Sequence, residues 1–214
     1  MRCPLCAATT DTPLLETAQR RYARCERCDL IFLHPDDRPR PLDEVMRYLE
    51  HRNSWSDAGY RTFLRQLAAP LCATVPEGAR GLDVGCGPTP VLAGILTASG
   101  RPTAHYDPLF HADHSVFATT YDFVTCTEVA EHAHDPRALF SRLFSAVRAG
   151  GILALMTQLH SDETDFEEWW YRRDLTHVCF YSARTLSWLA EHFDCELRDP
   201  APNVAFFTTR PGGT

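Results

Sequence analysis

The sequence predicts an α/β fold in which helices cover both faces of a sheet, preceded by a small metal-stabilised module. Three observations predict it. A short apolar strand runs into a glycine turn at residues 82–88, strands and helices alternate after that turn, and four cysteines lie within the first 28 residues. The length of 214 residues suffices for one substantial core and a small appendage.

The nine cysteines fall into two groups. The first forms two Cys-x-x-Cys pairs separated by eighteen residues: Cys3, Cys6, Cys25 and Cys28. This spacing is typical of a tetrahedral zinc site on a hairpin, and about forty residues bury too little apolar surface to fold unaided. A structural Zn²⁺ in a zinc ribbon is therefore expected, with a redox disulfide pair as the alternative. The scattered cysteines are expected to be buried small hydrophobes: Cys72, Cys86, Cys126, Cys179 and Cys195.

A proline-rich charged segment at residues 34–41 predicts a linker, because proline removes a backbone donor and restricts its predecessor. The expected organisation is a zinc-ribbon module at 1–40, a helical linker or cap at 41–78, and the α/β domain at 79–214.

Helical spacing of apolar residues predicts helices at 42–50 and 57–75. One stripe on the second helix is interpreted as packing rather than substrate binding: Tyr60, Phe63, Leu64, Leu67 and Leu71.

Beyond the glycine turn the pattern of strands and helices continues. Helices are expected at 90–99, 136–147 and 186–193, strands at 103–106, 122–126 and 152–156, and a closing hairpin at 195–199 and 203–209. Residues 108–120 leave little room for a further strand and helix, so one sheet edge is expected to be abbreviated.

The ordered motifs resemble those of class I S-adenosylmethionine-dependent methyltransferases over roughly residues 80–210. The stretches that carry the resemblance are Leu82-Asp-Val-Gly-Cys-Gly-Pro, Ala104-His-Tyr-Asp-Pro, and the run from Tyr121 to His132. The resemblance implies a Rossmann-like sheet and a set of residues that bind S-adenosylmethionine: Asp83, Gly85, Gly87, Asp107 and Thr127. In this family the glycine loop passes the methionine part of the cofactor and the acid after the second strand bonds the ribose. Thr89 stands where the family usually has a third glycine, which makes the turn more crowded.

A possible second metal site follows the strand at 122–126. Helical spacing would place Glu128, Glu131 and His132 on one face, and His177 is the candidate fourth ligand. Two carboxylates and imidazoles suit Mg²⁺, Mn²⁺ or Fe²⁺. The pattern resembles ubiquinone-pathway O-methyltransferases and small-RNA terminal 2′-O-methyltransferases, which implies catalytic roles for His132, His177 and Glu128. A metal-free site, with a histidine as general base or as a packing residue, is the alternative.

Three aromatic residues, Trp169, Trp170 and Tyr171, precede His177. They suit a lid over a planar ligand, or equally a part of the core.

The charge pattern bears on partners. All 21 basic side chains are Arg, and the net charge is −7. The segment after residue 40 is acidic, which disfavours nucleic acid, although four arginines could form a local basic patch: Arg20, Arg21, Arg24 and Arg27. A solvated ribbon face is the favoured interpretation of these four. No membrane span or secretory signal is evident, so a cytoplasmic protein is expected.

Together these features predict O-methylation of a small-molecule acceptor. The alternatives are methylation of RNA, methylation of carbon or nitrogen in a sugar or natural-product intermediate, and a non-catalytic binding module carrying a zinc ribbon. The oligomeric state is not predicted.

Overall fold

A six-stranded sheet forms the centre of the molecule. The computed structural model describes residues 1–10, 13–17, 19–50 and 54–212. The strand order is β10 (Cys195–Ala201), β11 (Val204–Thr209), β7 (Val147–Met156), β6 (Tyr121–Thr127), β4 (Gly81–Val84) and β5 (Thr103–Tyr106). β4 to β7 are parallel, whereas β11 and β10 are antiparallel additions. The predicted α/β class and the closing hairpin are confirmed.

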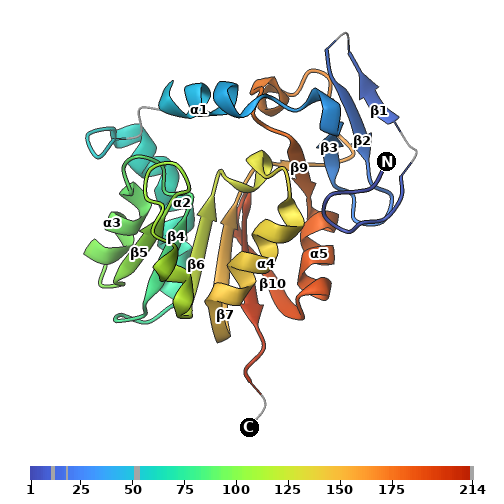
Figure 1. Ribbon diagram of the computed structural model, residues 1–214. Coiled ribbons are helices and arrows are strands. Elements are labelled where there is room, and N and C mark those ends of the chain that lie inside the picture. Colours follow the sequence, from blue (N-terminus) through green and yellow to red (C-terminus); the bar gives the residue numbers. More distant parts are fainter. Residues whose placement is uncertain (11–12, 18, 51–53, 213–214) are drawn as a thin grey trace.

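Helices cover both faces of this sheet. The pair α2 (Ala58–Thr74) and α3 (Val91–Ala98) lies on one face, and α4 (Pro136–Ala146) and α5 (Ala183–His192) lie on the other (Figure 1). Neighbouring strand residues alternate between the two cores, since side chains in a strand point to opposite faces. Phe123 and Ile152 pack with α2 and α3, whereas Val124 and Leu153 pack with α4 and α5.

The sheet ends at β5. After this strand the chain makes an isolated bridge between Asp107 and His111 and then a 3-10 helix, η2 (His114–Ala118). None of the described residues between 108 and 120 joins a strand. The predicted abbreviated edge is confirmed, and this edge lies beside the cavity described below.

The N-terminal strands belong to a second sheet that includes residues from the far end of the chain. Its order is β1 (Pro13–Glu16), β2 (Arg21–Arg24), β3 (Ile31–Leu33), β9 (Cys179–Ser182) and β8 (Leu159–His160). β3 pairs antiparallel with β9, and Phe32 lies opposite Cys179 (Figure 1). The boundaries 1–40, 41–78 and 79–214 remain predictions, but the hydrogen-bonded sheet extends across the first of them.

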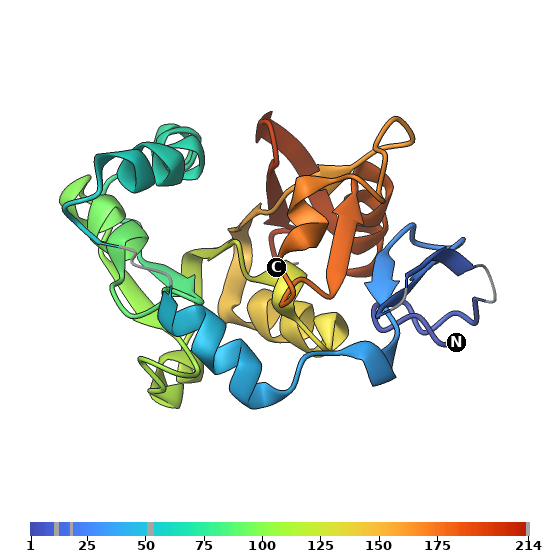
Figure 2. The same ribbon diagram turned by 90° about the horizontal axis from the view of Figure 1, so that it is seen from above.

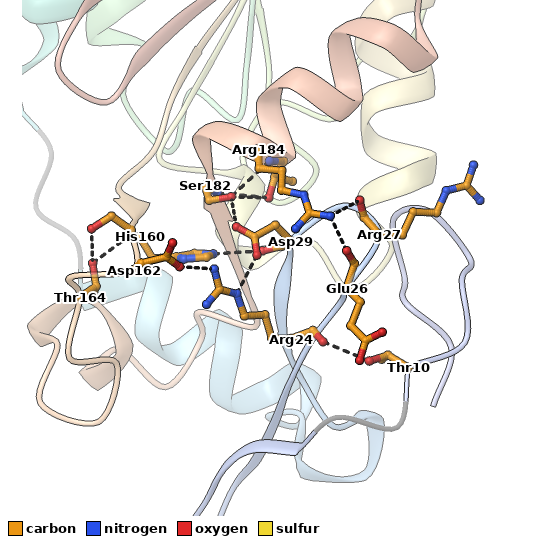
Figure 3. A network of polar contacts seen from close by, with 12 residues as sticks. Thr10, Arg24, Glu26, Arg27, Asp29, His160, Asp162, Thr164, Ser182 and Arg184 are labelled. Atoms are coloured by element: carbon orange, nitrogen blue, oxygen red, sulfur yellow. Dashed lines mark hydrogen bonds and ion pairs between the residues drawn. The ribbon is translucent and has the colours of Figure 1, made fainter.

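A buried polar network joins these strands to the rest of the molecule (Figure 3). The Asp29 carboxylate accepts hydrogen bonds from Arg24 Nε and Ser182 Oγ, each at 2.6 Å. Its main-chain carbonyl lies 3.1 Å from His160 Nε2. Arg24 also reaches Asp162, at 2.8 Å. Asp29, His160 and Ser182 are buried, so removing one of them would leave buried polar atoms unpaired, and their hydrogen bonds link the two parts of the molecule.

The arginines of the N-terminal strands are mostly bonded within the chain. Arg21 forms two hydrogen bonds with Asp37, at 2.9 and 2.7 Å, and Arg20 donates to the carbonyl of Leu175. With Arg24 in the network above, three of the four candidate basic side chains serve internal contacts. Arg21 and Arg24 still expose 43% and 34% of their side-chain surface, which agrees with the expected solvated face, and their ion pairs weaken the alternative of a basic patch.

A short 3-10 helix, η1 (Pro35–Asp37), leads to α1 (Pro41–Glu50). Helix α1 lies above the upper ends of the central strands in Figure 1 and extends from the N-terminal strands toward α2 (Figure 2). Arg47 Nη2 lies 2.9 Å from Asp174 Oδ2, and Glu44 Oε1 lies 2.8 Å from His134 Nε2. These contacts hold α1 over the strand ends. Within the described residues, no helix combines the length and apolar character needed to cross a membrane.

Candidate functional site

A cavity of about 720 Å³ opens at the carboxyl ends of β4 and β6. Its walls come from the glycine loop after β4, the segment after β5, the turn after β6, helices α1 and α2, and residues 170–177. In an open parallel sheet, ligands bind at this edge, where the order of the strands reverses. Every predicted cofactor-binding residue except Asp83 lines it: Gly85, Gly87, Asp107 and Thr127.

The two glycines of the loop have different physical roles. Both have positive φ, +82° at Gly85 and +67° at Gly87, where a side chain is strained. A Cβ at Gly85 would lie 2.2 Å from Val129 Cγ2, so this glycine is needed for packing. A Cβ at Gly87 would meet no described atom within 4 Å and would project into open space. Gly87 is therefore the position where a ligand can approach the backbone.

Asp107 is held by main-chain donors at the cavity wall. Its Oδ2 accepts from the Gly87 N–H at 3.0 Å, and its Oδ1 accepts from the N–H groups of Leu109 and Phe110 at 2.9 and 3.1 Å. These bonds fix the carboxylate beside the glycine loop. Oδ2 keeps a further lone pair, and a carboxylate in this position suits a hydroxyl group such as that of a ribose.

Asp83 lies beneath the cavity and is not part of its lining. It is buried, and it accepts a hydrogen bond from Thr125 Oγ1 at 2.7 Å. Burial raises the pKa of its carboxyl to about 6, although hydrogen bonds from Thr125 and the main chain of Ala93 act in the opposite direction. Its contacts indicate that Asp83 fixes the start of α3 against the sheet.

Two buried polar atoms that line the cavity lack hydrogen-bond partners among the described residues. They are Thr127 Oγ1 and Glu128 Oε1. Burial and the neighbouring Glu131 raise the pKa of Glu128 to about 8. Buried polar atoms are normally satisfied, so these two mark places where a ligand's polar groups fit.

The expected helical arrangement after β6 is wrong. Glu128 has φ of +51°, and only a short 3-10 turn, η3 (Ala130–His132), follows it. The sharp turn nevertheless directs Glu128, Glu131 and His132 to the same cavity. The spacing was compatible with a helix, but the left-handed residue at the strand end has no unambiguous sequence signal.

Three of the four candidate ligands of the second metal site come together. Single ligand atoms of Glu131, His132 and His177 lie within 4.8 Å of one another. Nδ1 of His177 lies 2.7 Å from the carbonyl of Tyr171, and Nδ1 of His132 lies 3.1 Å from the carbonyl of Thr176. A nitrogen that faces a carbonyl carries the proton, so in each neutral ring the lone pair belongs to Nε2. This is the orientation that metal-binding histidines adopt.

The aromatic residues before His177 divide between the core and the cavity. Trp169 packs against Phe166 and Phe180, with ring centroids 6.3 and 5.8 Å apart. Trp170 is 60% exposed and lines the cavity, as does buried Tyr171. The core expectation is confirmed for Trp169, and the lid over a planar ligand stays a prediction for the cavity-lining Trp170.

Some cavity residues were missed or misassigned from the sequence. Tyr60 and Phe63, interpreted as packing residues, line the cavity, whereas Leu64, Leu67 and Leu71 are buried as expected. Tyr48 and Arg47 of α1 also line it. Tyr171 donates through its hydroxyl to Glu131 Oε1 at 2.6 Å. No local pattern marks that contact, because the two residues lie forty positions apart.

The four N-terminal cysteines form a second cluster. Their sulfur atoms lie within 4.8 Å of one another and all four residues are buried. Each Cys-x-x-Cys turn closes in the same way: the Ala7 N–H donates to the Cys3 carbonyl at 3.0 Å, and the Asp29 N–H donates to the Cys25 carbonyl at 2.8 Å. Ala7 and Asp29 both have positive φ, +59° and +65°. Two matched turns that converge four thiols fit the donor set of a tetrahedral zinc site.

The comparisons with known proteins agree with this architecture. A family model described as a methyltransferase domain matches residues 48–199, well over half of the chain. The fold is similar to the crystal structure of 1,6-didemethyltoxoflavin-N1-methyltransferase from Burkholderia thailandensis, with a TM-score of 0.59 and 15% identity over 94% of this chain and 100% of that chain. An O-methyltransferase family protein from Burkholderia thailandensis gives a TM-score of 0.49 and 11% identity over 80% and 69% of the two chains. A search of curated protein sequences finds no significant match.

The chain belongs to the methyltransferase-domain family, and it is an S-adenosylmethionine-dependent methyltransferase. The alternative of a non-catalytic binding module is accordingly set aside.

Proposed function

We propose that this methyltransferase transfers the methyl group of S-adenosylmethionine to a hydroxyl oxygen of a small-molecule acceptor, with the help of a divalent cation. The observation that carries the proposal is the convergence of Glu131, His132 and His177 within 4.8 Å beside the cavity. A hydroxyl group must lose its proton to become a good nucleophile, and a cation held there favours that loss. The Glu-x-x-Glu-His pattern resembles that of ubiquinone-pathway O-methyltransferases, which are metal-dependent.

The residues of the cavity fit S-adenosylmethionine. Gly87 leaves space for close approach of a ligand to the backbone, and Asp107 Oδ2 is positioned to accept a hydrogen bond from a ribose hydroxyl. The unpartnered atoms of Thr127 and Glu128 lie at the end of β6, where the acceptor side of the cofactor is expected. When bound, the cofactor supplies an electrophilic methyl group, and the residues around it supply orientation and exclusion of water.

The donor set of the second cluster fits a hard or borderline divalent cation such as Mg²⁺, Mn²⁺ or Fe²⁺. Glu131, His132 and His177 would hold it, and Glu128 stands nearby as a further oxygen donor. Such a cation lowers the pKa of a coordinated hydroxyl group. Phe63 and the exposed Trp170 both line the cavity, and their aromatic rings suit an acceptor with a planar apolar ring.

Calorimetric titration with S-adenosylhomocysteine, with and without Mn²⁺, tests the cofactor site. Methyl transfer to a panel of catechols and vicinal diols then tests the acceptor class. In a chelator, wild-type activity is expected to fall at least tenfold and to return with Mn²⁺. Glu131→Gln is expected to lose the Mn²⁺ response, whereas Glu163→Gln, which changes an exposed carboxylate, should behave as wild type.

Unchanged activity in chelator would contradict the metal. Loss of activity in His177→Gln under those conditions would instead indicate a general base, because the ring lies in the cavity with Nε2 as the lone-pair nitrogen. Methylation of amines but not of hydroxyl compounds would favour the nitrogen alternative. The similar protein from Burkholderia thailandensis is named for methylation at N1, and its structure contains 1,6-didemethyltoxoflavin with S-adenosylhomocysteine.

We also infer that the four N-terminal cysteines bind one structural Zn²⁺. The inference is supported by their convergence, their burial and the matched turns that carry them. The described residues among 1–33 form only short strands around this cluster, so a metal adds stability that local packing cannot supply. Elemental analysis of protein prepared without added metal is expected to give one zinc per chain.

A further inference from the structure

Tyr171 contacts the metal-ligand cluster in two different ways. The residue lies in the 3-10 helix η4 (Trp170–Arg173) and is only 2% exposed. Its hydroxyl donates to Glu131 Oε1 at 2.6 Å, while Thr157 Oγ1 donates to Glu131 Oε2 at 2.9 Å. Two donors on the two oxygens fix the plane of the Glu131 carboxylate. The contact between Tyr171 and Glu128 Oε2 is longer, 3.3 Å, and one phenol hydrogen cannot serve both carboxylates equally.

The main chain of Tyr171 makes the second contact. Its carbonyl lies 2.7 Å from His177 Nδ1, and the two rings are 4.2 Å apart. This bond places the proton on Nδ1 and the lone pair on Nε2. One residue thus orients two of the three candidate ligands.

Two other buried tyrosines behave differently. The hydroxyl of Tyr121 donates to the carbonyl of Val116 at 2.8 Å, and that of Tyr181 donates to the carbonyl of Ala130 at 2.9 Å. A main-chain carbonyl satisfies a core phenol at little cost. Tyr171 instead bonds a carboxylate that is itself buried, which a purely structural role does not require.

We propose that Tyr171 is a positioning residue, which holds Glu131 and His177 in the arrangement that binds the divalent cation. The proposal rests on the metal-assisted function proposed above. Outer partners of metal ligands fix ligand orientation, and their loss typically weakens metal binding by about 10- to 100-fold.

Tyr171→Phe tests the hydroxyl contact, because it keeps the ring and the main-chain carbonyl. Free Mn²⁺ is followed by electron paramagnetic resonance during titration of the zinc-loaded protein, since thiolates favour zinc over Mn²⁺. The dissociation constant for Mn²⁺ is expected to rise at least tenfold. The dissociation constant for S-adenosylhomocysteine should stay within about twofold, since the contacts of Asp107 and Gly87 are unchanged. Tyr121→Phe is the matched control, because it removes a phenol bonded only to a carbonyl, and it should leave Mn²⁺ binding unchanged.

The outcomes separate the two proposals. Equal Mn²⁺ affinity in wild type and Tyr171→Phe overturns the role of Tyr171 and leaves the metal site standing. Absence of Mn²⁺ binding in the wild type overturns the metal site, and the inference about Tyr171 with it. If Tyr171→Phe does not fold, Thr157→Val removes the other hydroxyl donor to the same carboxylate. Unchanged Mn²⁺ affinity in that variant then overturns the proposal that hydroxyl donors position the Glu131 carboxylate for the cation.

Discussion

The main-chain N–H of Val178 donates a hydrogen bond of 2.8 Å to the carbonyl of Glu131. The carbonyl of the same Val178 accepts from the N–H of Leu33 at 2.9 Å. Two bonds therefore link the last strand of the cysteine-bearing module to the turn that carries a candidate metal ligand. His177 directly precedes Val178, so this link also restrains the second histidine of the site. Disorder in the N-terminal module would therefore be transmitted to the turn at residues 128–133, which carries Glu131.

Loss of the proposed zinc should therefore loosen the turn at residues 128–133 as well as the N-terminal strands. In Cys28→Ser, amide hydrogen exchange is expected to accelerate in residues 31–33, 178–182 and 130–133, because β3 no longer holds β9 in place. Mass spectrometry of peptic fragments measures this. Cys72→Ser, which changes a half-buried cysteine outside the cluster, should show the wild-type pattern. Acceleration limited to residues 31–33 would contradict the connection.

Alanine at the two loop glycines should separate folding from cofactor binding. Gly85→Ala is expected to lower the free energy of unfolding by about 2 to 4 kcal/mol, because positive φ and a clash with Val129 act together. Gly87→Ala should cost only about 1 kcal/mol, since a methyl group there meets no described atom within 4 Å.

The loss of affinity for S-adenosylhomocysteine should be larger in Gly87→Ala than in Gly85→Ala, which is the reverse of the order expected for the loss of stability. At least a tenfold loss is expected in Gly87→Ala, measured by calorimetry on protein shown by urea unfolding to be folded. Equal affinity of Gly87→Ala and wild type would mean that the ligand does not approach this part of the loop.

Much of the fold was predictable because its signals are local. The glycine turn at Gly85, the alternation of strands and helices, and the short interval at 108–120 each follow from neighbouring residues. The pairing of β3 with β9 was not predictable. It joins residues separated by almost 150 positions, and nothing in either strand specifies its partner. The boundary expected from the proline-rich segment 34–41 was inferred from local composition, so it gave no indication that a strand before it pairs with a strand far beyond it.

The candidate site was predictable at the level of residue types but not of geometry. The histidine at position 177 was correctly expected beside Glu131 and His132, since its segment follows β7 and can fold over the strand ends. The turn at Glu128 was not foreseen, because a left-handed conformation there depends on the close approach of Val129 to the glycine loop. The role of Tyr171 depends on a tertiary hydrogen bond, for which an aromatic run gives no indication.

The ion pair between Arg47 and Asp174 is expected to control access to the cavity. It joins α1 to the segment at 170–177, and both residues line the cavity. Arg47→Met should change the free energy of unfolding by less than about 1 kcal/mol, because the Arg side chain is 44% exposed. The dissociation rate of S-adenosylhomocysteine should increase several-fold, measured by stopped-flow displacement. Arg40→Met, which breaks an exposed pair with Asp43 at the start of α1, is the control and should leave that rate unchanged.

Asp83 should make stability depend on pH in a direction opposite to that of an ion-paired carboxylate. Burial raises the pKa of Asp83 in the folded state to about 6, above an unfolded value near 4. The folded state therefore binds the proton more tightly. The associated stabilisation is complete below about pH 4 and is lost as the pH rises through 6.

The difference in unfolding free energy between wild type and Asp83→Asn isolates this effect, because the amide stays neutral. From pH 5 to pH 7, the wild type is expected to lose about 1 kcal/mol relative to the variant, measured by urea unfolding at each pH. A changed hydrogen bond to Thr125 shifts the whole curve by a constant and does not alter its slope. Parallel curves for the two proteins would show that Asp83 keeps an ordinary pKa, and that its charge is stabilised by the main chain at the start of α3.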